Sequence, residues 1–224
     1  MSHDTYPEIV SPPVEKYLYG ILRPRQKVLA FLEKDAEKNN VPIVGPLVGN
    51  LLAMLAMSCN AKNILEIGTA TGYSGIWLAE VAMKNGGRLT TIEADPSRIK
   101  LARKSFEDSG LGNVVEIVKG DAKAEVPRIA RANPGMFDLA FIDVGDKSLY
   151  VDLLKDCIQA LKVGGFLVAD NTLWRGQVAN LSAKDVDTKT LREYNKRVYA
   201  DNRLHPIIVP LRDGVTVAMK LVDT

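Results

Sequence analysis

The chain has 224 residues, of which 46% are hydrophobic and 25% are charged, a composition typical of a globular protein with a sizeable buried core. This balance excludes intrinsic disorder, a collagen-like repeat and a small disulfide scaffold. Lysine and arginine number 29 against 27 for aspartate and glutamate, so the net charge of +2 gives no strong overall attraction to nucleic acid or to an anionic membrane.

The N-terminal part of the chain shows helical periodicity. Apolar residues recur at helical spacing in three segments: Val14–Leu22, Arg25–Asn39 and Pro46–Ser58. No repeat, low-complexity tract or linker rich in proline, glycine and serine divides the sequence. We therefore expect a single domain over residues 1–224, with residues 1–45 forming an N-terminal helical extension.

From Asn63 onward, short apolar runs alternate with amphipathic stretches. The runs typical of strands are Ile64–Ile67, Arg88–Glu93, Val114–Val118, Phe137–Ile142 and Gly165–Ala169. The amphipathic stretches between them are Gly75–Lys84, Pro96–Ser109 and Tyr150–Leu161. This alternation is typical of βαβ units, and it predicts an α/β fold with a doubly wound, mostly parallel sheet.

The C-terminal part predicts one more helix and two more strands. The helix is expected over Thr188–Ala200, and the apolar runs Ile207–Leu211 and Val215–Leu221 follow it. Arg212-Asp213-Gly214 stands between the two runs, and Asp-Gly is a signal of a tight turn. We expect these strands to form an antiparallel hairpin at the edge of the sheet.

Two features concern the cellular environment. Cys59 and Cys157 lie in apolar stretches without Cys-x-x-Cys spacing, so we expect buried thiols in a reducing compartment. The longest apolar stretch, Leu47–Met57, is too short to span a bilayer, and the first ten residues lack the pattern of a secretory signal. We expect a cytoplasmic protein that is not attached to a membrane.

The most informative segment is a predicted strand, turn and helix over residues 63–74. Gly68 and Gly72 flank the turn, where glycine lets the backbone approach a ligand at the carboxyl end of a strand. A dinucleotide site would need a third glycine where this chain has Ala70. Glu66 lies at the end of this strand, and Glu93 lies at the end of the next strand.

The two glutamates indicate the kind of cofactor. A carboxylate at the tip of the second strand can accept hydrogen bonds from both hydroxyls of a ribose, and an acid beside the first turn suits cationic groups. S-adenosylmethionine meets both demands, and its adenine would lie near Gly120-Asp121-Ala122 at the end of the third strand. In the alternative, the glycines only shape the turn and the glutamates are solvated strand ends.

A second group of polar residues follows two later strands. Asp143 and Asp170 each end an apolar strand, and Asn171 comes directly after the second of them. Neighbouring strands would bring these side chains together as an all-oxygen ligand set, which suits Mg²⁺ and also Ca²⁺ or Mn²⁺. In the alternative, Asp170 and Asn171 form a helix cap or a turn.

Such a cation would position an acceptor hydroxyl and lower its pKa, and two adjacent hydroxyls could both bind it. Lys147 lies just beyond the acidic group and is a candidate general base, since a nearby cation disfavours its ammonium form. In the alternative, it is an exposed lysine at a helix start. Lys147 and Asp143 are therefore the candidate catalytic residues.

Three motifs stand out: Leu65–Ser74, then Phe141–Asp143 followed by Asp146, Lys147 and Tyr150, and finally Ala169–Gly176, which reads ADNTLWRG. They resemble those of the class I O-methyltransferases of the caffeoyl-CoA and catechol type, which depend on S-adenosylmethionine and a divalent cation. The similarity runs from Val44 to Lys220 and includes the segment Pro210–Gly214.

The resemblance implies a seven-stranded, Rossmann-like sheet with an antiparallel C-terminal hairpin, a divalent cation and a homodimer. It also implies that residues 1–45 contribute to the acceptor pocket or to the dimer contact. The cofactor contacts that it implies come from Val44, Glu66, Gly68, Tyr73, Ser74, Glu93, Ala122 and Asp143.

The sequence departs from this family at one place. The family usually shows Asp-Ala-Asp-Lys, whereas this chain has Asp143-Val-Gly-Asp146-Lys147, with one extra residue between the two acids. We expect the loop to bulge, with Gly145 as the residue that allows it. We also expect Asp143, which is held by the strand, to bind the cation, and Asp146 only to orient Lys147 or the loop.

The sequence therefore favours an O-methyltransferase that acts on a catechol-like small molecule. The first alternative is a methyltransferase for a hydroxylated uridine of transfer RNA, whose phosphates could meet Arg23, Arg25 and Lys27. A second is a cofactor-binding module without catalysis, and a third is a polyamine synthase on the same fold. Trp174 either lines the acceptor pocket or packs beneath its loop.

Overall fold

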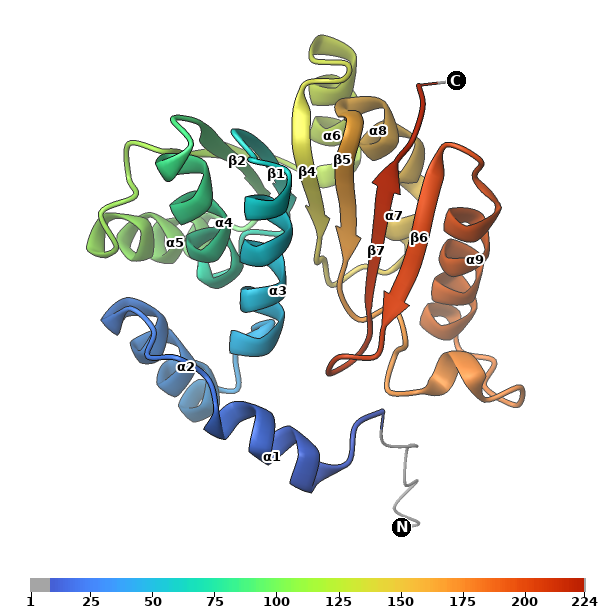
Figure 1. Cartoon of the computed structure of the whole chain (residues 1–224), viewed down its shortest axis with the longest axis horizontal. Helices are drawn as coiled ribbons and strands as arrows, with labels where there is room; N and C mark the ends of the chain where they lie inside the picture. The colour runs from blue at the N-terminus through green and yellow to red at the C-terminus, as the bar shows by residue number, and fades with distance from the viewer. Residues whose placement is uncertain (1–8, 224) are drawn as a thin grey trace.

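The structure, a computed structural model, describes residues 9–223 and is built around a seven-stranded sheet (Figure 1). The strands lie in the order β3-β2-β1-β4-β5-β7-β6. The first five are parallel, and β7 runs antiparallel to both β5 and β6. The strands are β1 (Asn63–Ile67), β2 (Arg88–Glu93), β3 (Val115–Lys119), β4 (Phe137–Ile142), β5 (Leu161–Ala169), β6 (Leu204–Val209) and β7 (Val215–Lys220).

This arrangement confirms the predicted α/β fold with a mostly parallel, seven-stranded sheet and an antiparallel C-terminal hairpin. Residues 1–8 and Thr224, and with them the start of the expected N-terminal extension, lie outside the described residues. The α-helices in the described part are α1 (Pro12–Gly20), α2 (Lys27–Asn39), α3 (Gly45–Ser58), α4 (Tyr73–Lys84), α5 (Pro96–Asp108), α6 (Ala122–Ala132), α7 (Ser148–Asp152), α8 (Leu154–Ala160) and α9 (Val186–Ala200).

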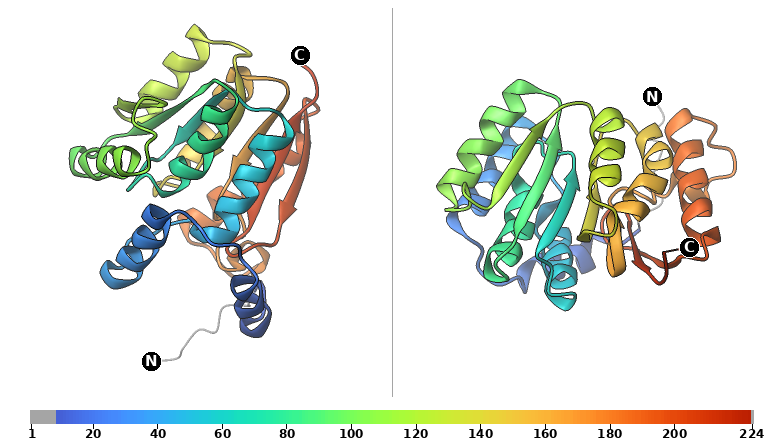
Figure 2. Two further views of the ribbon diagram at one scale, coloured as in Figure 1. Left: turned by 60° about the vertical axis from the view of Figure 1, so that its left-hand side comes forward. Right: turned by 90° about the horizontal axis from the view of Figure 1, so that it is seen from above.

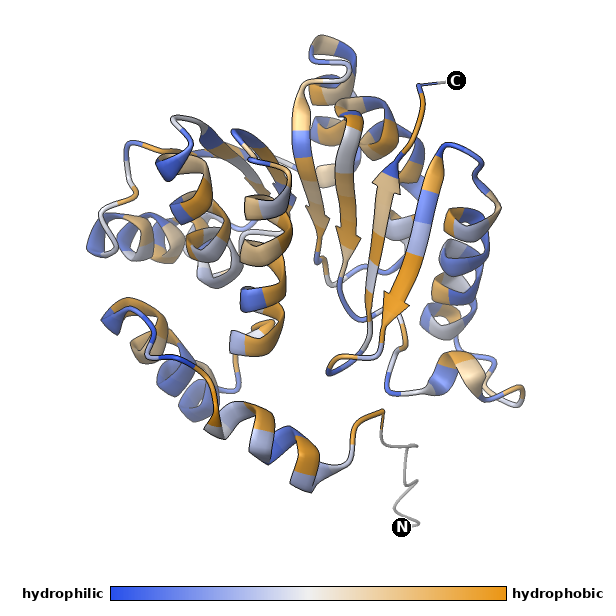
Figure 3. Ribbon diagram, viewed as in Figure 1, coloured by the Kyte–Doolittle hydropathy of each residue, from blue (hydrophilic) through white to orange (hydrophobic). Residues whose placement is uncertain are grey.

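Two hydrophobic clusters hold helices to the two faces of the sheet. Helices α3, α4 and α5 pack on one face, and α6 to α9 pack on the other (Figure 2). Strand β4 lies between them, and all six of its residues are buried. Apolar residues are concentrated on the central strands of the sheet (Figure 3), as expected for a parallel sheet that is covered on both faces.

The first two helices lie away from the sheet, beyond the carboxyl ends of β4 and β5 (Figure 1). Helix α1 has no buried residue, whereas α2 buries Leu29, Leu32 and Ala36. Polar contacts also hold α2: Glu33 accepts a hydrogen bond from Tyr73 of α4 at 2.7 Å and forms a bidentate ion pair with Arg25. These contacts hold the N-terminal helices near the carboxyl ends of the parallel strands.

Two helical segments differ from the predictions. Helix α6 was not predicted, because Pro127 inside it is a helix breaker in most contexts and the segment lacks a long apolar run. The segment Tyr150–Leu161, predicted as one amphipathic stretch, forms the two short helices α7 and α8 with Leu153 between them, and Leu161 already belongs to β5.

The C-terminal hairpin is confirmed, but its connection is longer than a two-residue turn. The last strand pair joins Val209 to Val215, which leaves the five residues 210–214 in the loop. Within this loop the N–H of Gly214 donates to the carbonyl of Leu211 at 2.9 Å. The strand β6 therefore ends two residues earlier than the apolar run suggested.

The two cysteines are free thiols that lie in different surroundings. Cys157 is fully buried, and burial raises its pKa to about 12. Cys59 is only half-buried, so the prediction of a buried thiol is wrong in degree at this position. Between residues 9 and 223, none of the helices combines the length and the apolar character that crossing a membrane requires.

Candidate active site

The first part of the site lies where the chain leaves β1. Gly68 has a left-handed backbone with φ of 101°, and an added Cβ there would overlap the carbonyl oxygen of Asp143. Only glycine allows β1 and the end of β4 to approach this closely. The glycine is therefore needed for packing, whether or not a ligand binds beside it.

Glu66 is completely buried behind this turn. Its carboxylate accepts hydrogen bonds from Ser74 Oγ and from Thr91 Oγ1, both at 2.6 Å. Burial raises the pKa of Glu66 to about 7, although the two hydroxyl donors oppose that shift. Glu66 is therefore not a solvated strand end, and it joins β1, β2 and the start of α4.

Glu93 ends β2 and lines a small cavity of about 200 Å³. One carboxylate oxygen accepts the N–H of Ala70 at 2.9 Å, and the other accepts the N–H groups of Ala94 and Asp95 at 3.0 Å. Three backbone donors thus fix the carboxylate before any ligand arrives. The predicted residues that line the same cavity are Gly68, Ala122 and Asp143.

The two predicted acids lie side by side at the end of neighbouring strands. Ile142 of β4 pairs with Ala169 of β5, so Asp143 and Asp170 follow at the same level of the sheet. Burial raises the pKa of Asp170, and the neighbouring Asp143 carboxylate raises it further. Asp143 lines the small cavity and Asp170 lines a larger one, so this pair marks the place where the two cavities meet.

The atoms around Asp170 fit a divalent cation. Its Oδ1 is buried and has no hydrogen-bond partner within residues 9–223. In that part of the chain, groups of three or more His, Cys, Asp or Glu side chains able to hold a metal ion are absent. An oxygen site here would therefore consist of two carboxylates and the amide of Asn171, which is a donor set for Mg²⁺ rather than for zinc.

Lys147 is 3% exposed and lies directly beside this pair. Its Nζ donates to the carbonyl of Val144 at 2.9 Å, to Asn171 Oδ1 at 3.0 Å and to the Tyr150 hydroxyl at 3.1 Å. The Tyr150 hydroxyl then donates to the backbone carbonyl of Asp170 at 3.0 Å. Lys147 is therefore not an exposed lysine at a helix start.

The protonation of Lys147 depends on opposing influences. Burial lowers its pKa and is the largest effect, whereas the carboxylates of Asp143 and Asp170 raise it. Its ammonium also lies 4.7 Å from the ring centre of Tyr150 and 5.4 Å from that of Trp174. These contacts fix the position of Nζ beside Asn171, which lines the larger cavity.

The loop between Asp143 and Lys147 accommodates its extra residue without help from glycine. Gly145 does not have positive φ, and a Cβ added to it would meet open space, so the expectation that this glycine permits the loop is wrong. Asp146 accepts hydrogen bonds from the N–H and the hydroxyl of Ser148, at 2.9 and 2.7 Å. Its carboxylate therefore caps the start of α7.

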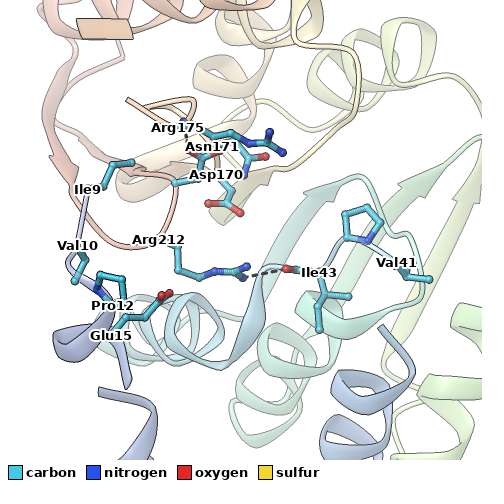
Figure 4. Close-up of a pocket in the computed structure, with 12 residues that line it drawn as sticks. Ile9, Val10, Pro12, Glu15, Val41, Ile43, Asp170, Asn171, Arg175 and Arg212 are labelled. Atoms are coloured by element: carbon cyan, nitrogen blue, oxygen red, sulfur yellow. Dashed lines mark hydrogen bonds between the residues drawn. The ribbon is translucent and has the colours of Figure 1, made fainter. Parts of the chain in front are cut away.

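The larger cavity, of about 610 Å³, opens beside Asp170 (Figure 4). Its wall combines the start of α1, the segment before α3, the end of β5 and the loop between β6 and β7. The lining residues are Ile9, Val10, Pro12, Glu15, Val41, Pro42, Ile43, Asp170, Asn171, Arg175, Arg212 and Asp213. The N-terminal segment thus completes a cavity whose other walls come from the segment before α3 and from loops that follow β5 and β6.

A sequence profile described as O-methyltransferase matches residues 24–221. This chain belongs to the O-methyltransferase family. A catechol O-methyltransferase of Niastella koreensis is 32% identical to it over 213 residues, which cover 92% of this chain and 96% of that protein.

Solved structures of O-methyltransferases share the fold. The enzyme from Bacillus cereus in complex with SAH has a TM-score of 0.82 and 28% identity, and the match covers 93% of this chain and 97% of that one. The enzyme TomG from Streptomyces achromogenes, in complex with SAM, has a TM-score of 0.82 and 27% identity, with coverage of 94% and 96%.

In this O-methyltransferase the predicted cofactor residues form two groups. Gly68, Glu93, Ala122 and Asp143 line the small cavity. Glu66, Ser74, Tyr73 and Val44 are buried and line neither of the two cavities, and the hydroxyl of Tyr73 donates to Glu33 of α2. The predicted cation ligands Asp143, Asp170 and Asn171 lie together with Lys147.

Sequence reasoning assigned no role to three residues of this site, although Tyr150 and Arg212 stand in segments that it quoted. Thr91 bonds Glu66, Tyr150 links Lys147 to Asp170, and Arg212 donates to the backbone carbonyls of Ile43 and Val44. Thr91 lies two residues before Glu93 on the same strand, so the period of two could have placed it beside the first turn. Arg212 was noted only as part of the hairpin turn, and nothing in its local pattern indicates a contact with residues 43 and 44.

Proposed function

We propose that this O-methyltransferase transfers a methyl group from S-adenosylmethionine to a hydroxyl of a catechol-like small molecule, in the presence of a divalent cation. The observation that carries the proposal is the pair Asp143 and Asp170. Asp143 lines the small cavity and Asp170 lines the large one. A methyl donor in the small cavity and an acceptor in the large one would therefore meet at this pair.

The small cavity suits the nucleoside part of S-adenosylmethionine. Glu93 would accept hydrogen bonds from the ribose, and Gly68 and Ala122 leave room for the cofactor along the wall. Two solved relatives with SAM or SAH bound support this choice of cofactor. Glu66 would act from behind the turn, because its carboxylate is engaged by Ser74 and Thr91.

Asp143, Asp170 and Asn171 would hold the divalent cation, for which Mg²⁺ is the best match to the donor set. When bound, the cation would lower the pKa of the acceptor hydroxyl and hold its oxygen near the methyl donor. The buried, unpartnered Oδ1 of Asp170 supports this assignment, since a buried carboxylate oxygen without a donor is costly unless a cation joins it.

Lys147 would take the proton of the acceptor hydroxyl. Its Nζ lies against Asn171, and burial lowers its pKa, which increases the neutral fraction that can accept a proton. Tyr150 would position Nζ, because its hydroxyl accepts from the lysine and donates to the Asp170 backbone. With S-adenosylmethionine bound, the deprotonated acceptor oxygen would bond to the methyl carbon as the bond from that carbon to sulfur breaks, which would leave S-adenosylhomocysteine.

The larger cavity suits a small acceptor with adjacent hydroxyls. Its volume of about 610 Å³ lies in the range of small-molecule sites, and the N-terminal extension supplies apolar residues to its wall. The catechol O-methyltransferase of Niastella koreensis, 32% identical, supports this acceptor class. A transfer-RNA acceptor is less favoured, because Arg25, one of three basic residues considered for it, is engaged by Glu33.

The test is a methyl-transfer assay with the purified protein, S-adenosylmethionine and 1,2-dihydroxybenzene, with product identified by mass spectrometry. We expect product with Mg²⁺, none in excess chelator, and recovery when Mg²⁺ is restored. A parallel assay with 1,3-dihydroxybenzene, whose hydroxyls cannot both bind one cation, should give little product. Turnover in excess chelator, with metal content checked, would contradict the role of the cation.

A further inference from the structure

Two arginines line the larger cavity next to the acidic pair. Arg212 comes from the loop between β6 and β7, and Arg175 comes from the loop that follows β5 (Figure 4). Neither of them has a role in holding the cofactor or the cation. The reaction proposed above therefore leaves two positive charges in the acceptor cavity without a function.

Both arginines stand on backbone that side chains rarely adopt. Arg212 has φ of 49° and Arg175 has φ of 52°, in the left-handed region where glycine is favoured. Gly176, directly after Arg175, has φ of 74°, as expected for that residue type. Strained positions of this kind occur where a particular side chain is needed at a site.

The guanidinium groups have no acidic partner within residues 9–223. Arg212 donates through one nitrogen to the carbonyls of Ile43 and Val44, and it is half-buried. No side-chain hydrogen bond or ion pair of Arg175 occurs in the same part of the chain.

Three acids line the same cavity, and none of them forms an ion pair with the two arginines. Asp170 belongs to the acidic pair, Asp213 accepts the backbone N–H of Arg175, and Glu15 lies on α1. With Asp170 assigned to the cation, two acids face two arginines on the wall, and the buried Lys147 adds a further positive charge. Arg212 is within electrostatic range of Asp143, Asp170 and Asp213 but forms no direct ion pair with them. Once a cation engages the first two acids, a half-buried guanidinium without a direct ion pair favours an anionic ligand.

We propose that the acceptor carries a carboxylate, which Arg212 binds and Arg175 supports at the rim of the cavity. This inference rests on the proposed function and adds the charge of the substrate to it. A guanidinium presents parallel N–H donors that match the two oxygens of a carboxylate. The donors of Arg212 other than the nitrogen bonded to residues 43 and 44 remain available within the described residues.

The position of Arg212 favours a small carboxylate over the phosphates of a nucleic acid. It is attached to the carbonyls of residues 43 and 44 inside a cavity whose wall includes apolar Ile9, Val10 and Pro12. Phosphate-backbone contacts are instead made by exposed basic surfaces that follow a long polyanion. An RNA ligand therefore becomes an outcome of the test.

The test compares 3,4-dihydroxybenzoate with 3,4-dihydroxybenzamide, which share the ring and the adjacent hydroxyls but differ in charge. Calorimetry measures the binding of each to protein loaded with S-adenosylhomocysteine and Mg²⁺, and the methyl-transfer assay gives kcat/KM. We expect the benzoate to be preferred by at least about tenfold, mainly through KM, as for a hydrogen-bonded charge pair.

The decisive variant is Arg212→Gly, because glycine suits the left-handed backbone and the protein should fold. It should bring the preference for benzoate close to one, and Arg175→Gln should reduce it by less. Arg131→Gln removes an exposed arginine of α6, away from the cavity, and should leave the preference unchanged.

Equal binding of the two probes by the unmodified protein, or a preference that survives Arg212→Gly, would overturn the inference while leaving methyl transfer to catechols intact. If neither probe is methylated, the proposed function fails, and the calorimetric preference still decides the role of Arg212. Salt-dependent binding of transfer RNA that is lost in Arg212→Gly would show that the anion is a phosphate backbone and would also overturn it.

Discussion

The two cavities of this O-methyltransferase differ in how far their polar groups are satisfied by the protein itself. On the cofactor side, the Glu93 carboxylate accepts three backbone N–H groups, and Glu66 accepts two hydroxyls. On the acceptor side, Asp170 has a buried oxygen without a partner, and Asn171 and Arg212 have left-handed backbone.

The difference follows from the task of each half. A cofactor that is common to many reactions needs a site that is fixed before binding, and backbone donors supply that rigidity at no cost in side-chain freedom. In the proposed reaction the acceptor side would surround a cation and a reacting oxygen, so its polar groups would be arranged for partners that arrive later. Variants that disturb one half should therefore behave differently from variants that disturb the other.

The largest expected effect is that of Asp170→Asn. Loss of one carboxylate from the pair should lower kcat/KM with Mg²⁺ by at least about 10²-fold. The same change should stabilise the protein in chelator by on the order of 1 kcal/mol, because it removes a buried carboxylate whose pKa is raised by burial and by the neighbouring Asp143. Product formation and the denaturation midpoint at pH 8 measure the two effects.

Asp108→Asn is the matched control for that change, since it removes an exposed carboxylate at the end of α5. It should alter neither quantity by a measurable amount. Normal turnover of Asp170→Asn with Mg²⁺ would show that the acidic pair does not hold a cation. A parallel loss of stability would show that the pair is instead a structural element.

The next largest expected effect concerns the removal of the acceptor hydroxyl proton by Lys147. Lys147→Met keeps the length of the buried side chain but removes Nζ, and it should lower kcat by about 10² to 10⁴-fold if Lys147 is the general base. Tyr150→Phe should lower kcat by less, because it removes only one of the three contacts of Nζ. A Lys147→Met protein with near-normal kcat would leave the cation alone to activate the hydroxyl.

On the cofactor side the expected loss is in binding rather than in rate. Glu93→Ala should weaken the affinity for S-adenosylhomocysteine by about 1.5 to 3 kcal/mol, the usual contribution of a hydrogen bond to a charged group. Isothermal calorimetry without metal measures it, and the exposed Glu116→Ala on β3 serves as control. Unchanged affinity in a folded Glu93→Ala protein would remove the ribose assignment.

The fold was predictable because its signals are local. The strand Arg88–Glu93 and the strand Phe137–Ile142 were predicted with the bounds that the structure has, since an apolar run between polar segments marks both. Helix α6 escaped because Pro127 breaks the expected pattern, and packing of Val126 and Ile129 onto the sheet helps to keep it helical. Tertiary contacts there override a local preference.

The site was easiest to predict where a residue directly follows a strand. Asp143 and Asp170 follow paired strands, so the sheet brings them together by register alone. Arg212 reaches the carbonyl of Ile43, 169 positions earlier, and no period or spacing relates two such distant segments. The expected role of Gly145 was wrong for a similar reason, because the loop faces open space that the sequence does not reveal.

The last expected effect tests whether the buried Glu66 on the cofactor side lowers the stability of the protein at neutral pH. Glu66 is fully buried, and its pKa is raised to about 7 in the folded protein from 4.5. The folded state therefore binds more protons than the unfolded state between these values, so stability falls as pH rises from about 4.5 to about 7 and then stays lower.

Glu66→Gln lacks this titration and can still bond both hydroxyls, because the amide offers one donor and one acceptor. Between pH 5 and pH 8, urea unfolding should show the unmodified protein losing on the order of 2 to 3 kcal/mol relative to Glu66→Gln. Glu116→Gln, which changes an exposed residue, should lose stability with pH as the unmodified protein does. An equal pH dependence of all three proteins would mean that the hydrogen bonds from Ser74 and Thr91 fully offset the effect of burial on the pKa of Glu66.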